Sequence, residues 1–149
     1  MSFAKPSLKG RALRLLSGRE HSRPELERKL KSFEEEPGSL AQALDELQAK
    51  GFISEQRVIE SVVHRRAAKL GTARIKQELQ SKGLAPEAVC EALAGLQASE
   101  LERAQAVWRK KFNQAPQNPK EIAQQMRFLA ARGFGSEVIR AVVAGKFED

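Results

Sequence analysis

The apolar pairs Leu40-x3-Leu44, Val89-x3-Leu93 and Val138-x3-Val142 recur at a spacing of 49 residues and predict the architecture of this chain. The two members of each pair lie one turn apart on a helix, so each pair marks a strip that faces a core. A period near fifty residues is typical of stacked helical units that bury their faces against one another. Such an array has an elongated surface, which favours a large binding partner. The same 49-residue step is kept by Leu30, Leu79 and Phe128.

Helix-start signals support this interpretation. Ser22-Arg23-Pro24-Glu25 has the spacing of a capping box, and we expect the helix that follows to bury Leu26, Leu30 and Phe33 on one side. We predict further capping boxes at Ser39 with Gln42 and at Ser99 with Glu102, and a cap at Asn118 followed by proline. The sequence therefore predicts an all-α fold, an elongated array of three tandem three-helix repeats at 1–52, 53–98 and 99–149.

Three helices are predicted to close in the same way, at Lys50-Gly51-Phe52, Lys82-Gly83-Leu84 and Arg132-Gly133-Phe134. Glycine adopts the left-handed conformation that follows many helices, and the next apolar residue folds back on the last turn. The three cations lie where the helix dipole favours positive charge, so we set Lys50, Lys82 and Arg132 aside as binding candidates.

Composition limits the class of protein. The chain has 149 residues, 41% of them hydrophobic, which is ordinary for a folded protein. Its single cysteine, Cys90, cannot form an internal disulfide and fits a reducing compartment, so we expect a cytoplasmic protein and read Cys90 as a small core residue. No apolar run approaches the roughly 20 residues of a membrane span, so we expect no membrane partner.

The net charge of +7 alternates along the chain. Residues 1–31, 57–82 and 103–149 carry +6, +5 and +5, while 32–56 and 83–102 carry −5 and −4. Basic charge thus falls on the first and second helices of each unit, and stacking in register would line those helices along one face. The alternative is that these runs are merely solvated helix faces.

Residues suited to catalysis or metal binding are sparse. The only histidines, His21 and His64, are not spaced as ligands with each other or with Cys90, and the usual phosphate-binding glycine loops are missing from the sequence. No nucleophile, base and orienting residue form a recognisable set. We therefore expect no catalytic residues, no metal, no cofactor and no enzymatic activity.

The stretch from Gly71 to Gly83 contains the pairs Arg74-Ile75, Glu78-Leu79 and Lys82-Gly83 at regular four-residue intervals. In these pairs and their spacing it resembles the RecX family of recombinase regulators, and two further stretches agree. The stretch from Ala12 to Leu30 resembles the family's opening, and Arg127 to Ile139 resembles its close. The likeness covers nearly the whole chain in the family's order. The chain departs from the family pattern at Leu70 and at Val58, where aromatic residues are common, and at Ser54-Glu55, where paired aspartates are frequent.

The resemblance implies a protein that binds RecA and the RecA filament on single-stranded DNA. In that family the helical array lies in the filament groove, blocks filament growth and lowers RecA's ATPase, strand-exchange and co-protease activities. It would thereby modulate recombinational repair and the SOS response. We expect a monomer with weaker, nonspecific affinity for DNA alone. Two alternatives stay open, a stand-alone basic helical nucleic-acid-binding module and a scaffold for an unrelated partner.

The basic segment of the middle unit supplies the predicted contacts to the filament or to phosphate. Arginine is favoured over lysine there because its planar fork makes two parallel hydrogen bonds to phosphate or carboxylate. The central candidates are Arg65, Arg66, Lys69, Arg74 and Lys76, with Arg14, Arg19, Arg109, Lys110 and Lys111 as flanking support.

Overall fold

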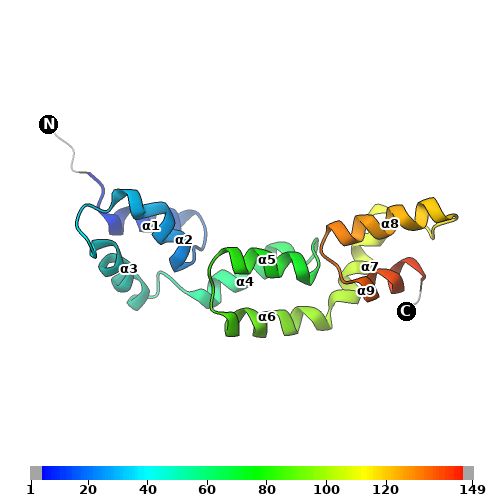
Figure 1. Cartoon of the computed structure of the whole chain (residues 1–149). Helices are drawn as coiled ribbons and strands as arrows, with labels where there is room; N and C mark the ends of the chain where they lie inside the picture. Colours follow the sequence, from blue (N-terminus) through cyan, green and yellow to red (C-terminus); the bar gives the residue numbers. More distant parts are fainter. Residues whose placement is uncertain (1–4, 146–149) are drawn as a thin grey trace.

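The computed structural model describes residues 5–145, and within that range it contains helices and no strand. The helices are grouped in threes along an elongated row, with the two ends of the chain at opposite ends of the array (Figure 1). The all-α prediction of three tandem three-helix repeats is confirmed.

The first group holds α1 (Leu8–Gly18), α2 (Arg23–Leu30), a short 3-10 turn η1 (Lys31–Phe33) and α3 (Ser39–Ala49). The second holds α4 (Glu55–Arg66), α5 (Thr72–Ser81) and α6 (Pro86–Ala98), and the third α7 (Glu100–Lys111), α8 (Pro119–Ala131) and α9 (Ser136–Val143).

Each group has its own apolar core, as a repeat array requires. The first core contains Ala12, Leu26, Leu30, Leu40, Leu44, Leu47 and Ile53. The second contains Val58, Ile59, Val62, Ile75, Leu79, Leu84, Val89 and Leu96. The third contains Ala104, Leu129, Phe134, Ile139, Val142 and Val143. Ile53, which we expected to open the second unit, packs into the first core; the boundaries 1–52, 53–98 and 99–149 stay a prediction.

The 49-residue register holds for the buried pairs Leu30 with Leu79 and Leu40 with Val89. In the third group it holds at the buried Val142 and shifts at Phe128 and Val138, which are only partly buried. Leu30 and Leu79 are both buried, whereas Phe128 lies partly buried at the edge of its core. The buried equivalent of Leu79 is Leu129, and that of Val89 is Ile139, each 50 residues further on. Equivalent connections differ in length, because residues 67–71 join α4 to α5 whereas residues 112–118 join α7 to α8.

Two of the four predicted caps are confirmed and two are wrong. Ser22 forms a full capping box with Glu25, and the Asn118 side chain accepts a hydrogen bond from the amide of Glu121. The Ser39 hydroxyl instead donates to the carbonyl of Glu36, and the Ser99 hydroxyl donates to that of Leu96. Both serines sit where a preceding turn offers a free carbonyl, so their hydroxyls bond backward to the turn.

Glu34, not Ser39, supplies the side-chain cap at the start of α3. Its carboxylate accepts a hydrogen bond from the amide of Leu40 at 2.9 Å and forms an ion pair with the ammonium of Lys31 at 3.1 Å. The chain consequently leaves α2 at Leu30 and turns through η1, which leaves the Phe33 side chain 43% exposed. The expectation that Phe33 continues the buried strip of Leu26 and Leu30 is wrong.

The predicted helix closures are confirmed by positive φ angles at Gly51, Gly83 and Gly133, of 83°, 69° and 91°. The amide of Phe52 bonds back to the carbonyl of Leu47, and that of Phe134 to the carbonyl of Leu129.

The second helices of the three groups are aligned head to tail, and this alignment holds the array together. The end of α8 rests on the start of α5, where the amides of Gly71 and Ala73 donate to the carbonyls of Arg132 and Gly133 at 2.7 and 3.2 Å. The end of α5 rests in turn on the start of α2, where the Ser22 hydroxyl donates to the carbonyl of Lys82 at 2.6 Å. Each joint satisfies backbone groups that a helix terminus leaves without an intrahelical partner, and it brings the positive end of one helix dipole to the negative end of the next.

Candidate functional site

Basic side chains gather at the joint between the second and third groups, around two adjoining hollows. The first, of about 460 Å³, is lined by Arg66, Lys69, Leu70, Arg74, Gln77, Glu78 and Arg132. The second, of about 480 Å³, is lined by Ala68, Lys69, Ala106, Val107, Lys110, Lys111, Phe128 and Arg132. Lys69 and Arg132 belong to both hollows, so the two form one continuous surface. We call Arg66, Lys69, Arg74, Lys110, Lys111 and Arg132 the joint surface.

Helix ends position these cations. Arg66, Lys111 and Arg132 lie at or just beyond the last residue of α4, α7 and α8, where the negative end of each helix dipole stabilises positive charge. Arg74 lies in the first turn of α5, which is the helix that α8 abuts. Four helices from two repeats therefore contribute to the joint surface, and no single repeat contains it.

Buried and half-buried side chains of the third group bond to the second group beneath this surface. Glu100 is 2% exposed, and its carboxylate accepts from the amide of Thr72 at 2.8 Å, which supplies the cap that α5 otherwise lacks. Arg103 donates to the carbonyls of Ala67, Leu70 and Leu96, where α4 and α6 end. A side chain from the third group thus satisfies carbonyl groups at two helix ends of the second.

The cations of the joint surface differ in how far they are already engaged. Arg66 forms an ion pair with Glu78 at 2.9 Å, and Arg74 donates to the carbonyl of Ala131 at 2.6 Å. Arg132 and Lys111 lie 4.9 and 5.6 Å from the centroid of the Phe128 ring. Exposed ion pairs and cation–π contacts are weak, of about 1 kcal/mol or less, so these charges still present a positive potential to a partner.

Lys69 and Lys110 are the cations of the joint surface with the greatest freedom. Both are exposed, and neither forms a salt bridge or a side-chain hydrogen bond within residues 5–145. They line the second hollow together, so a bound anion would meet both ammonium groups.

The structure brings five of the ten predicted site residues into the joint surface, namely Arg66, Lys69, Arg74, Lys110 and Lys111. Arg65 lies beside it, 3.5 Å from the carboxylate of Glu78. Lys76, Arg109 and Arg14 are exposed and line neither of its hollows. Arg132, which we had set aside as a helix-end cation, lies in both hollows; its place before Gly133 was visible in the sequence, but its neighbours were not.

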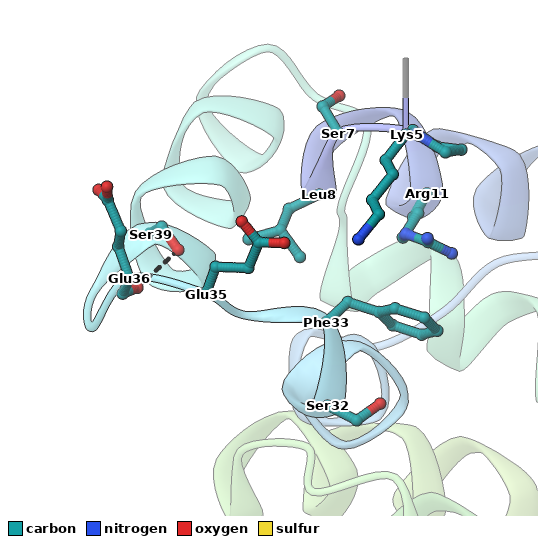
Figure 2. Close-up of a pocket in the computed structure, with 10 residues that line it drawn as sticks. Lys5, Ser7, Leu8, Arg11, Ser32, Phe33, Glu35, Glu36 and Ser39 are labelled. Carbon is teal, nitrogen blue, oxygen red and sulfur yellow. Dashed lines mark hydrogen bonds between the residues drawn. The ribbon is translucent and has the colours of Figure 1, made fainter. Parts of the chain in front are cut away.

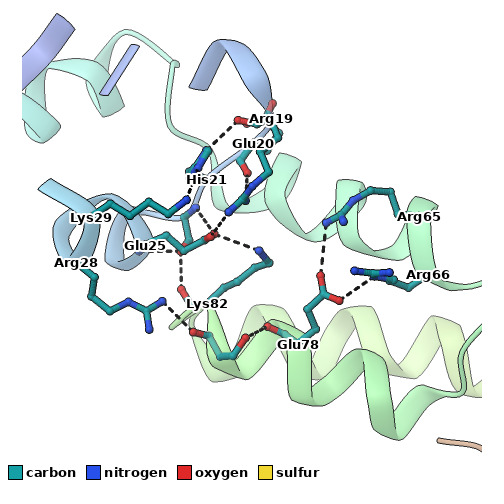
Figure 3. Close-up of polar contacts among 12 residues, drawn as sticks. Arg19, Glu20, His21, Glu25, Arg28, Lys29, Arg65, Arg66, Glu78 and Lys82 are labelled. Atoms are coloured by element: carbon teal, nitrogen blue, oxygen red, sulfur yellow. Dashed lines mark hydrogen bonds and ion pairs between the residues drawn. The ribbon is translucent and has the colours of Figure 1, made fainter. Parts of the chain in front are cut away.

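Arg19 has a structural role at the joint between the first and second groups (Figure 3). It forms an ion pair with the buried carboxylate of Glu25 at 2.8 Å, and Lys82 reaches the other oxygen of Glu25 at 3.3 Å. Burial raises the pKa of Glu25, but the hydrogen bonds from Arg19 and from the Ser22 amide, together with the charge of Lys82, lower it to about 2. Glu25 is therefore ionised at neutral pH and ties α2 to the end of α5.

The buried ring of His21 lies next to this cluster. Its Nδ1 is 3.0 Å from the carbonyl of Arg19, and its Nε2 is 3.2 Å from the ammonium of Lys29. Burial lowers the pKa of His21, and the nearby cations act in the same direction against the hydrogen bond to Arg19. The ring is thus neutral at pH 7 and accepts a hydrogen bond from Lys29. Cys90, which we expected in the core, is exposed.

Within residues 5–145, no three His, Cys, Asp or Glu side chains are grouped as metal ligands. In the same range no helix is long and apolar enough to cross a bilayer.

Comparison with known proteins bears directly on this arrangement of repeats. Models of the first, second and third three-helix domains of RecX match residues 9–47, 54–93 and 98–143, in that order. The chain is 53% identical over 137 residues to the regulatory protein RecX of Leptothrix cholodnii, covering 92% of this chain and 87% of that protein. The chain belongs to the RecX family of regulatory proteins.

Other RecX proteins agree with this assignment. The RecX of Ralstonia nicotianae is 48% identical over 139 residues, covering 93% of this chain and 87% of that one. The crystal structure of RecX from Lactobacillus salivarius superposes with a TM-score of 0.77 at 21% identity, covering 93% of each chain. At that identity the superposition supports the shared RecX fold and says nothing about individual contact residues.

Proposed function

We propose that this RecX protein binds RecA and the RecA filament on single-stranded DNA and inhibits filament growth, ATPase activity, strand exchange and co-protease activity. In this role it modulates recombinational DNA repair and the SOS response in the cytoplasm, as a monomer without catalytic activity of its own. The match of three RecX domains, in order along the chain, carries the proposal.

The construction of the array supports a partner that is itself repetitive. Three separately cored units are joined by direct contacts between α2, α5 and α8. An elongated array of this kind presents side chains from all three units along its length, and such a surface suits contact with more than one subunit of a filament at once.

The joint surface supports an anionic target at the middle of that contact. We propose that Lys69 and Lys110 meet acidic side chains of RecA or phosphates of the filament DNA, with Arg66, Arg74, Lys111 and Arg132 around them. Charge complementarity of this kind mainly accelerates association and orients the partner. Arg65 and Lys76 of the middle basic segment remain candidates in the proposal, as do the flanking residues Arg14 and Arg109.

The DNA-dependent ATPase of RecA, titrated with this protein, tests the proposal. The double variant Lys69→Glu with Lys110→Glu should raise the concentration for half inhibition at least about tenfold, because two favourable charge contacts of roughly 1 kcal/mol each become repulsive. A matched control is Lys50→Glu with Lys120→Glu, which makes the same charge change at exposed positions outside both hollows and outside the predicted contact residues. Equal loss of inhibition in the two double variants would show that net charge alone matters, and would reject the joint surface.

Salt dependence separates the filament regulator from a stand-alone nucleic-acid-binding module. Affinity for bare single-stranded DNA should fall with a slope of about −0.7Z in log K against log salt for Z neutralised phosphates. Contacts with RecA survive screening by salt, so affinity for the filament should fall less steeply as the salt concentration rises. Inhibition should also need fewer molecules of this protein than of RecA, because blocking one growing end affects many subunits. Inhibition that needs enough protein to coat the strand, and that vanishes with salt, would favour the module.

A further inference from the structure

A second basic site surrounds the exposed ring of Phe33, at the end of the array away from the third group. A hollow of about 230 Å³ is lined there by Pro6, Gly10, Arg11, Arg14, Leu15, Lys29, Leu30 and Phe33. It combines apolar walls with three cations and contains no carboxylate. Among residues 5–145 the Arg14 side chain forms no ion pair or hydrogen bond, so its charge is uncompensated.

Two residues set the position of the Phe33 ring: Glu34, which anchors the adjoining backbone, and Arg11, which lies over the ring. Glu34, the next residue, is fixed by its hydrogen bond from the amide of Leu40 and its ion pair with Lys31. The guanidinium carbon of Arg11 lies 3.8 Å from the centroid of the Phe33 ring, and Figure 2 shows Arg11 and Lys5 on one side of that ring. An aromatic ring kept 43% exposed in a defined orientation is a ready surface for stacking.

We propose that Phe33, Arg11, Arg14 and Lys29 form a subsite for one unpaired nucleotide of single-stranded DNA. The base packs against the exposed part of the Phe33 ring beside the Arg11 guanidinium, and Arg14 and Lys29 contact the adjoining phosphate. A nucleotide presents a flat apolar group next to an anion, which is the combination that this hollow offers.

A neighbouring hollow of about 660 Å³ shares Pro6, Arg11 and Phe33 with this subsite, but Glu35 and Glu36 also line it. Those two carboxylates repel phosphate, so the strand is expected to run past Arg14 and Lys29 instead. An acidic peptide would satisfy the cations as well, but it would leave the exposed part of the Phe33 ring, which Arg11 does not cover, without a stacking partner.

The subsite does not depend on RecA, and its test uses DNA alone. The probe is a fluorescein-labelled oligothymidylate of about 15 nucleotides, compared with an abasic strand of equal length and charge. The wild-type protein should prefer the thymidine strand by roughly 5-fold or more, because stacking of one base contributes about 1–3 kcal/mol.

Phe33→Leu keeps an apolar side chain at this exposed position and removes the ring, so it should fold normally and bind both strands equally. The matched control is Phe52→Leu, since Phe52 is exposed to a similar extent (46%) and does not line the hollow; it should keep the preference. Arg14→Glu should weaken the binding of both strands by a similar factor, because contacts to phosphate are independent of the base.

A wild-type protein that binds the abasic strand as well as the thymidine strand would overturn the subsite, as would a Phe33→Leu variant that keeps the preference. Competition by polyglutamate together with equal binding of the two strands would assign the hollow to an acidic peptide instead. Inhibition of the RecA ATPase, measured on the same variants, reports separately on the proposed regulatory function.

Discussion

Replacing Gly71 by alanine should separate the second and third repeats without disturbing either of them. Gly71 has an ordinary backbone φ of −79°, so alanine is acceptable there in isolation. A Cβ atom at this position would, however, lie 2.3 Å from the backbone carbon and oxygen of Gly133. Because those atoms belong to the backbone, they cannot turn aside as a side chain would, and the end of α8 must move away from α5.

The decrease in the free energy of unfolding can be estimated from the contacts that this movement breaks. The amides of Gly71 and Ala73 lose hydrogen bonds of 2.7 and 3.2 Å to the end of α8, each worth about 1 kcal/mol. The exposed hydrogen bond from Arg74 to the carbonyl of Ala131 goes with them. Adding the strain of overpacking, we expect Gly71→Ala to lower the free energy of unfolding by about 2–4 kcal/mol.

Urea denaturation followed by both circular dichroism and tryptophan fluorescence measures this effect. Trp108 is the only tryptophan and donates to the side chain of Gln125 within the third repeat, so its fluorescence reports on that repeat. In the wild-type protein the two signals should change together, whereas in Gly71→Ala the fluorescence transition should move to lower urea and separate from the circular dichroism signal.

Gly95→Ala provides the matched control, because Gly95 lies inside α6 and a Cβ there would meet nothing within 4 Å beyond the adjoining backbone of its own helix. Its replacement should raise the free energy of unfolding by about 0.5–1 kcal/mol through helix propensity. An unchanged urea midpoint with coincident signals in Gly71→Ala would refute the idea that direct contact between α5 and α8 joins the repeats.

Three further outcomes are expected. Stability should decline in acid in two stages. The pKa of His21 is lowered in the folded state, so its contribution to stability is present above the ordinary value of 6.5 and is lost as the pH falls below 6.5. Glu25 has a folded pKa of about 2, so its contribution is present above 4.5 and is lost as the pH falls toward 2. Glu25→Gln should flatten the second stage in urea titrations between pH 5 and 2, and an unaltered acid profile would contradict this account. Asn118→Ala should lower the free energy of unfolding by about 1 kcal/mol and Ser39→Ala by clearly less, because only Asn118 accepts a hydrogen bond from a helix-start amide; equal losses in urea denaturation would be inconsistent with these caps. Arg103→Met should lower the melting temperature with a loss of about 2–4 kcal/mol, since it leaves several helix-end carbonyls without their donor; an unchanged melting temperature would show that solvent replaces Arg103.

Local pattern was sufficient to predict the helices and their cores. Leu26 and Leu30 lie four residues apart on one helix, as do Leu40 and Leu44 on the next, and an apolar strip of this kind can be recognised within each segment alone. Ser22 and Asn118 also acted as predicted, because a cap depends on residues three positions away. Ser39 and Ser99 failed where a carbonyl of the preceding turn competed for the hydroxyl, and Phe33 failed because the capping carboxylate of Glu34 ended α2 early.

The sequence by itself determined the number of helices, the repeat and the excess of positive charge, since these follow from periodicity and composition. Only the tertiary structure decided which cations meet. Arg132 and Lys69 are 63 residues apart in the chain, and they share a hollow because α8 ends against the start of α5. Arg19 and Lys82, equally basic in the sequence, are instead engaged by the buried carboxylate of Glu25. The physical reason is that charge is a property of one residue, whereas its availability to a partner depends on the residues that other helices place beside it.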